Sequence, residues 1–137
     1  MPDPSFANDS SIADGEVLLR RLQPDWIVPG NHGRMRIASA AFKHEELSIL
    51  FYALLQSQGR TVQDAMCGYP TNSLCSITAG LARELGQAVV YEVSHPNDPA
   101  HGLVVGKKTK AVANRFAREA GWVIPSEAPP IEETGND

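Results

Sequence analysis

The chain has 137 residues, of which 42% are hydrophobic and 20% are charged, and its formal net charge at pH 7 is −4. This length suits one domain with a single core and is too short for two, while the composition excludes a disordered chain. The apolar runs are too short to span a membrane, and the N-terminus lacks the basic and apolar regions of a secretory signal, so we expect a cytoplasmic protein without a membrane partner.

The negative charge is concentrated at the two ends of the chain. Residues 1–14 and 126–137 contain seven of the 16 acidic residues and no lysine or arginine, which leaves nine acidic residues against all 12 basic ones in between. The central part is therefore mildly basic, with a formal charge of +3. Proline, glutamate and few apolar residues predict a disordered acidic tail over residues 126–137. Residues 1–12 are expected to form a flexible N-terminal segment, so the domain is expected over residues 13–125.

The first predicted element is a helix over residues 14–22, DGEVLLRRL. The segment offers an N-cap candidate, an early glutamate and apolar residues at helical spacing, and Pro24 would end it. Two short strands, over residues 25–28 and 34–37, flank the turn-forming PGNHG segment. They are expected to pair as a hairpin.

The apolar run ELSILFYALLQSQG is compatible with a strand or a helix, because a short continuous apolar run does not reveal its period. We favour a helix over residues 48–57, with Ser48 as its cap and Gly59 at its end. A second short helix is predicted over residues 61–66, with Thr61 as its N-cap.

The second half of the chain alternates less regularly between strands and helices. SLCSI, residues 73–77, is a predicted strand, and Thr78 and Gly86 would begin and end the helix that follows. AVVYEV and HGLVVG are two more predicted strands, and the last helix is expected between Thr109 and Gly121. This order predicts the α+β class, as a single compact domain with a small mixed sheet and flanking short helices.

Two segments resemble a group of short uncharacterised bacterial proteins, and the resemblance covers most of residues 16–123. An S-x-A-F-K pattern is matched by Ser39, Ala41, Phe42 and Lys43. An H-x-x-V-V-G-K-K-T pattern is matched by His101, Val104, Val105, Gly106, Lys107, Lys108 and Thr109. The resemblance implies a compact bacterial domain and brings no activity, substrate or cofactor with it. The cysteines are not part of the shared pattern.

A glycine, two lysines and a threonine connect the last predicted strand to the helix after it, in the order that phosphate-binding loops use. The P-loop pattern G-x-x-x-x-G-K-[ST] also needs an earlier glycine, which is missing before Gly106, so a Walker-type nucleotide site is excluded. Two alternatives remain. The helix start and its lysines would form an anion site, or Gly106 makes an ordinary turn and the lysines are solvated.

Further cations extend this region into a basic helix face between Gly106 and Arg118. Such a face would attract an anionic ligand or an acidic protein partner. Nucleic acid is the weaker alternative, because no helix-turn-helix, zinc-finger or RNP motif accompanies the face. The candidate ligand-binding residues are Arg36, Lys43, Gly106, Lys107, Lys108, Thr109, Arg115 and Arg118.

Three side chains of the HPNDPAH segment, His95, Asp98 and His101, are of the types that bind zinc. The segment is also an ordinary turn sequence, so we expect neither a metal nor another cofactor. The two cysteines, Cys67 and Cys75, lack the spacing of a zinc site and are expected to be free, packed thiols.

Two enzymatic hypotheses use His101. In the first, Cys75 before a helix and His101 at the start of a strand are loosely similar to papain-like thiol hydrolases. In the second, His101 acts as acid or base beside Ser39, Arg36 and Lys107, whose cations would stabilise developing charge. We favour a protein that binds an anionic ligand or a protein partner; the alternative is a small hydrolase or transferase using His101 with Ser39 or Cys75.

Overall fold

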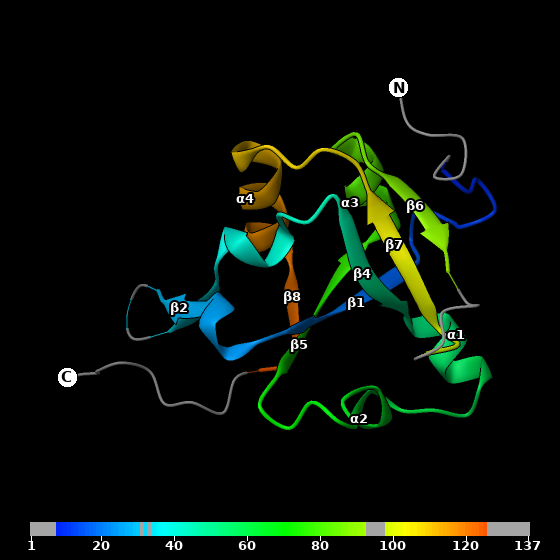
Figure 1. Ribbon diagram of the computed structural model, residues 1–137, viewed down its shortest axis with the longest axis horizontal. Coiled ribbons are helices and arrows are strands. Elements are labelled where there is room, and N and C mark those ends of the chain that lie inside the picture. The colour runs from blue at the N-terminus through cyan, green and yellow to red at the C-terminus, as the bar shows by residue number, and fades with distance from the viewer. Residues whose placement is uncertain (1–7, 31, 33, 93–97, 126–137) are drawn as a thin grey trace.

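A six-stranded antiparallel sheet, in the order β6-β7-β4-β1-β5-β8, forms the centre of the molecule (Figure 1). Its strands are β1 (Val17–Leu22), β4 (Glu46–Phe51), β5 (Ser73–Thr78), β6 (Ala88–Tyr91), β7 (His101–Val105) and β8 (Gly121–Ile124). The computed structural model describes residues 8–30, 32, 34–92 and 98–125. The predicted α+β class is confirmed. The expected small mixed sheet is wrong, because the sheet is large and its described strand pairs are antiparallel.

Short helices and one hairpin surround the sheet (Figure 1). The helices are α1 (Tyr52–Ser57), α2 (Val62–Ala65), α3 (Ala79–Glu84) and α4 (Lys110–Glu119), with two 3-10 helices, η2 (Pro24–Trp26) and η4 (Ser39–Phe42). The predicted hairpin is confirmed as β2 (Ile27–Pro29) paired with β3 (Met35–Ile37), but its first strand begins at Ile27 and not at residue 25, because η2 occupies residues 24–26. None of the helices in the described ranges is long and apolar enough to cross a bilayer.

The helix predicted over residues 14–22 is wrong, because β1 occupies this segment. β1 lies inside the sheet and pairs with β5 at six positions, from Val17↔Thr78 to Leu22↔Ser73. Apolar side chains cover both faces of this strand, with Leu18 in one core and Leu19 in the other. A strand that is buried on both faces loses the alternating pattern, so its leucines fall at helical spacing by coincidence.

The helix predicted over residues 48–57 is only half right. The chain is a strand up to Phe51 and becomes helical from Tyr52 to Ser57, so Ser48 lies within β4 and caps nothing. Leu47, Ile49 and Phe51 all join one core cluster, which is the two-residue period of a strand. One apolar run therefore contains both structures.

The three threonine caps were predicted correctly. Thr61 forms a capping box with Asp64 at the start of α2, and the hydroxyls of Thr78 and Thr109 accept backbone N–H bonds at the starts of α3 and α4. The strands predicted around residues 73–77, 88–93 and 101–106 are present as β5, β6 and β7 within the described residues. Gly121 follows the last helix, as expected. It also begins the strand β8, which the sequence did not indicate.

Two apolar cores lie on opposite faces of the sheet. One face is covered by α3, α4 and η4, where the rings of Phe42 and Phe116 stack at a centroid distance of 5.5 Å. The other face is covered by α1 and α2, whose Leu55 and Ala65 pack against residues of β1, β4 and β5. The sheet therefore separates two environments, and the face on which a side chain lies decides which groups it meets.

The domain begins earlier than expected. Ile12 is 1% exposed and belongs to the larger core, and the N–H of Asp9 donates to the carbonyl of Val89 at 3.0 Å. The expectation of a flexible segment is therefore wrong for residues 8–12. The tail expected over residues 126–137 lies outside the described residues.

Candidate anion-binding cavity

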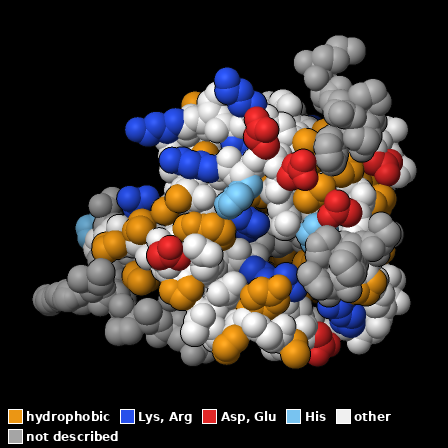
Figure 2. Space-filling model, viewed as in Figure 1, with side chains coloured by type: hydrophobic (Ala, Val, Ile, Leu, Met, Phe, Trp, Pro, Cys, Tyr) orange, Lys and Arg blue, Asp and Glu red, His pale blue; other side chains and the backbone are white. Residues whose placement is uncertain are grey.

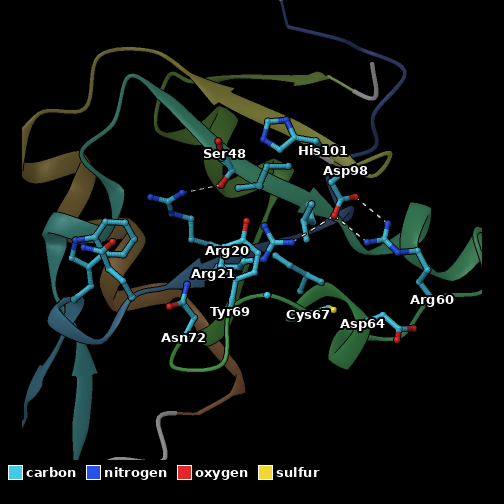
Figure 3. Close-up of a pocket in the computed structure, with 16 residues that line it drawn as sticks. Arg20, Arg21, Ser48, Arg60, Asp64, Cys67, Tyr69, Asn72, Asp98 and His101 are labelled. Atoms are coloured by element: carbon cyan, nitrogen blue, oxygen red, sulfur yellow. Dashed lines mark hydrogen bonds and ion pairs between the residues drawn. The ribbon is translucent and has the colours of Figure 1, made fainter. Parts of the chain in front are cut away.

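A cavity of about 710 Å³ lies where β1 and β4 separate (Figure 3). These strands pair only at Leu18↔Phe51 and Leu19↔Leu50, and β1 then continues along β5 alone. The wall is completed by η2, by α2 and the loop after it, and by the start of β7. A cavity of this volume is of the size that holds small ligands.

Arg20 is the buried cation of this cavity, with 7% of its surface exposed. Its guanidinium donates to the carbonyl of Ala41, through Nε at 3.1 Å and Nη2 at 2.9 Å, and through Nη1 to the carbonyl of Ser48 at 3.0 Å. Ser48 lies on the part of β4 that no longer pairs with β1. The Arg20 side chain therefore supplies the hydrogen bond to its carbonyl that a neighbouring strand would otherwise supply. Burial lowers the pKa of Arg20 to about 10, and the guanidinium therefore stays protonated at neutral pH.

The charge of Arg20 has no carboxylate partner among the described residues. Its Nη2 lies 3.4 Å from His44 Nδ1, and its Cζ lies 5.0 Å from the centre of the Trp26 ring. Burial, with the charges of Arg20 and Lys108, lowers the pKa of His44, so this imidazole is neutral at pH 7. Peptide dipoles and an aromatic ring thus stabilise the guanidinium without neutralising it.

Two further arginines meet at Asp98 on the opposite side of the cavity (Figure 3). Arg60 donates to both carboxylate oxygens at 3.0 Å, and Arg21 Nη2 lies 3.5 Å from Oδ2. Burial alone would raise the pKa of Asp98, but the hydrogen bonds from Arg60 and the Ala100 N–H, together with the charges of both arginines, lower it. Asp98 is therefore ionised at neutral pH, and it links the segment before β7 to Arg21 of β1 and to Arg60 after α1.

The cavity wall carries more positive than negative charge. Arg20, Arg21 and Arg60 line it with two carboxylates, those of Asp98 and Asp64. Asp98 is already bound by two arginines, and Asp64 accepts the N–H of Thr61 as part of the α2 capping box. Guanidinium groups present planar sets of donors that match carboxylate and phosphate oxygens. The arrangement is suited to an anion.

His101 is the predicted catalytic residue that lines this cavity. It pairs with Leu50 of β4, and its Nδ1 lies 2.9 Å from Glu92 Oε1. A carboxylate therefore lies next to the imidazole, and this pair of groups occurs in many acid–base sites. His101 therefore joins the cavity, on the face of the sheet that α1 and α2 cover.

Cys75 and Ser39 are not brought to His101. The row of paired residues His101, Leu50, Leu19 and Ser76 lies on one face of the sheet, so Cys75, one position from Ser76, lies on the other. Cys75 is buried in the larger core, and burial raises the pKa of its thiol to about 12. Ser39 begins η4 and does not line the cavity.

The cations predicted around α4 are divided between structural and exposed positions. Lys108 Nζ donates to the carbonyls of Glu45, Val104 and Gly106 at 2.9, 3.0 and 2.9 Å, and burial lowers its pKa to about 8. Arg115 is paired with Glu84 and Glu119. Both side chains are therefore occupied within the fold.

The remaining candidates for ligand binding lie outside the cavity wall. Thr109 caps α4, while Gly106 has a φ of 149° and lies so close to Gln87 that a Cβ would be 2.6 Å from its Oε1. Exposed side chains are those of Arg36, Lys43, Lys107 and Arg118. Figure 2 shows Lys and Arg side chains gathered near α4, apart from those at the central hollow.

Zinc ligands do not converge within the described part of the chain. No group of three or more His, Cys, Asp or Glu side chains suited to a metal is found there. Asp98 is bound by arginines, and His95 lies outside the described residues. Cys67 and Cys75 are free thiols, but Cys67 is exposed and not packed as expected.

The sequence pattern did not reveal the central arginines, because it predicts a helix over residues 14–22, which contains Arg20 and Arg21. Two adjacent arginines inside the apolar run VLLRRL were the signal that could have found them. In a strand they point to opposite faces, so both cannot be solvated when the strand lies inside a sheet. Arg60 carried no comparable signal, since its partner Asp98 is 38 residues away.

No family model matches the chain, and no curated protein or solved structure shows a significant match to it. The function of the cavity is therefore inferred from its geometry.

Proposed function

We propose that this protein binds a small anionic ligand in the cavity between β1 and β4, with Arg20 as its central cation. The observation that carries the proposal is the burial of Arg20 at the cavity wall without a carboxylate partner among the described residues. A buried charge is costly when no opposite charge accompanies it. A bound carboxylate or phosphate would supply that charge.

Arg21 supports the same function from the opposite face of β1. Its Nε donates to the carbonyl of Ala65 at 2.8 Å, and its Cζ lies 4.1 Å from the centre of the Tyr69 ring. These contacts hold the guanidinium in one orientation at the cavity wall. A donor that is already held in place loses little conformational entropy when an anion binds.

The exposed face of α4 is the alternative location for an anionic ligand or an acidic protein partner. Lys107, Lys110 and Arg118 are exposed there, whereas Lys108 and Arg115 are engaged within the fold. Exposed charges in water contribute little to affinity, and salt screens them. The buried arginine of the cavity makes the stronger site.

Calorimetric titration with inorganic phosphate, at constant ionic strength, tests the proposal. We expect binding to the unchanged protein and to Arg118→Gln, and binding at least about tenfold weaker in Arg20→Met, since charge-assisted hydrogen bonds contribute about 1.5–3 kcal/mol. Circular dichroism checks that Arg20→Met is folded, and Arg21→Gln serves as a second cavity variant. Loss of binding in Arg118→Gln with full binding in both cavity variants would move the site to α4.

A second candidate function is acid–base catalysis on the bound anion by His101. The observation that favours it is the distance of 2.9 Å between His101 Nδ1 and Glu92 Oε1 beside the arginines. His101→Ala would then abolish turnover of a phosphate ester such as p-nitrophenyl phosphate while phosphate still binds. Equal turnover by the unchanged protein and by His101→Ala, or no turnover by either, would leave binding as the function.

A further inference from the structure

We propose that the anion carried into this cavity is the phosphate of a nucleoside monophosphate, either free or at the end of a nucleic-acid strand. The inference rests on the anion-binding function proposed above and names its ligand. It comes from what the cavity wall holds besides arginine: two aromatic rings, two amide side chains, and more space than an inorganic anion fills.

The aromatic rings come from segments far apart in the sequence and flank the two neighbouring arginines. Trp26 belongs to η2 and lies against Arg20, while Tyr69 follows α2 and lies against Arg21. Both rings line the cavity, and Tyr69 is 41% exposed. An exposed aromatic ring beside fixed cations is a platform on which a nucleobase can stack while its phosphate meets the guanidinium groups.

Both of these arginines keep N–H groups that are not used within the fold. Among the described residues, Arg21 Nη1 has no partner, and Arg20 Nη1 donates one of its two N–H groups to Ser48. One N–H of Arg20 Nη1 and both N–H groups of Arg21 Nη1 are therefore left for phosphate oxygens. Arg20 and Arg21 are adjacent in β1 and leave it on opposite faces, and both side chains line the cavity at the place where β4 has separated from β1.

The size and the remaining polar groups of the cavity agree with a nucleotide. A volume of about 710 Å³ exceeds what a phosphate ion needs and lies in the range of cavities that hold ligands of drug size. The amides of Gln23 and Asn72 also line the wall, and each offers both a donor and an acceptor. Such groups can pair with the edge of a base.

Titrations with ribose 5-phosphate and AMP separate the contribution of the base from that of the phosphate. We expect AMP to bind about tenfold more tightly, because stacking of one base on an aromatic side chain strengthens binding by roughly this factor or more. Tyr69→Leu should remove most of this difference and leave ribose 5-phosphate within about twofold. Tyr52→Leu is the matched control, since Tyr52 is an exposed tyrosine outside the cavity wall.

The outcomes distinguish this inference from the function on which it rests. Equal affinities for ribose 5-phosphate and AMP would overturn the nucleotide assignment and leave anion binding intact. Absence of binding by ribose 5-phosphate, AMP and inorganic phosphate would overturn both. Trp26→Leu provides a second test of stacking if Tyr69→Leu does not fold. Tighter binding of a 5′-phosphorylated trinucleotide than of AMP would support the assignment and identify a strand end as the source.

Discussion

Arg60 donates to both carboxylate oxygens of Asp98 at 3.0 Å and so ties the segment after α1 to the segment before β7. The Asp98 side chain is 8% exposed, and its Oδ1 also accepts the N–H of Ala100 at 2.8 Å. Both residues of this bidentate pair line the cavity, and the pair holds the cation of Arg60 at its wall. Its contribution to stability is therefore open to direct measurement.

Asp98→Asn should destabilise the protein by about 2 kcal/mol at pH 7, the contribution expected for hydrogen bonds to a charged group. The pKa of Asp98 is lowered in the folded state, so its contribution is complete above its unfolded pKa, near 3.8, and is lost as the pH falls through the folded value. Urea unfolding at pH 7 and at a series of lower pH values measures this. A difference between the two proteins that does not shrink as the pH falls below 3.8 would contradict the role given to this carboxylate.

Gly102→Ala should destabilise the sheet by several kcal/mol. A Cβ at this position of β7 would overlap the ring of Phe51 and lie 2.8 Å from the carbonyl oxygen of Val90. Overpacking of a filled interior costs about 1–3 kcal/mol, and here backbone as well as a ring would have to move. Gly15→Ala is the control, because nothing lies within 4 Å of its added Cβ. Equal melting temperatures for the two variants would show that the space beside Phe51 is not filled.

Lys108 should cause the free energy of unfolding to increase with pH in the alkaline range. Burial lowers its pKa to about 8 from 10.5, so between these values the unfolded chain binds more protons than the folded one. The stability attributable to this group therefore rises as the pH increases from about 8 to about 10. Comparison of unfolding free energies with those of Lys108→Met across this range isolates the effect. Parallel curves for the two proteins would show that the pKa of Lys108 is not lowered.

The two thiols should differ sharply in reactivity. Cys67 is exposed at the cavity wall, whereas Cys75 is fully buried and burial raises its pKa to about 12. Because the thiolate is the reactive form, a thiol reagent at pH 8 should modify one cysteine in the folded protein and both in denaturant. Rapid modification of Cys75 in the folded state would contradict its place in the core. Cys67→Ser identifies which thiol reacts.

Bound phosphate should slow the modification of Cys67. The thiol and the proposed anion share the cavity, so an occupied cavity restricts the approach of the reagent. The rate is to be measured with and without phosphate at matched ionic strength. An equal reduction by chloride would show that screening, and not occupancy, causes the effect.

Local signals in the sequence were sufficient to predict much of the fold. Thr61, Thr78 and Thr109 were expected to begin helices and do so, because each hydroxyl bonds an N–H only three residues away. The β2–β3 hairpin was also predictable, since the turn lies between the two strands that it joins. Such interactions are complete within a few residues, and the rest of the chain hardly changes them.

The position of β1 and β4, and with it the cavity, was decided by the tertiary structure. Leucines on both sides of β1 hide its strand period, and only the two cores on either face of the sheet make this extended conformation favourable. Arg20 acquires its role because β4 departs from β1 and leaves the carbonyl of Ser48 to be bonded. Lys108 was expected at an anion site, but its Nζ instead donates to the backbone carbonyls of Glu45, Val104 and Gly106.

The composition, the charge distribution, the threonine caps and the hairpin turn were thus determined by the sequence itself, since each depends on residues that are counted or are close in the chain. The cavity charge depends on partners such as Arg60 and Asp98, which lie 38 residues apart. Burial and the distances between side chains decide which arginine is paired with a carboxylate and which one lies beside the cavity without such a partner. Both burial and these distances are set only by the packed structure.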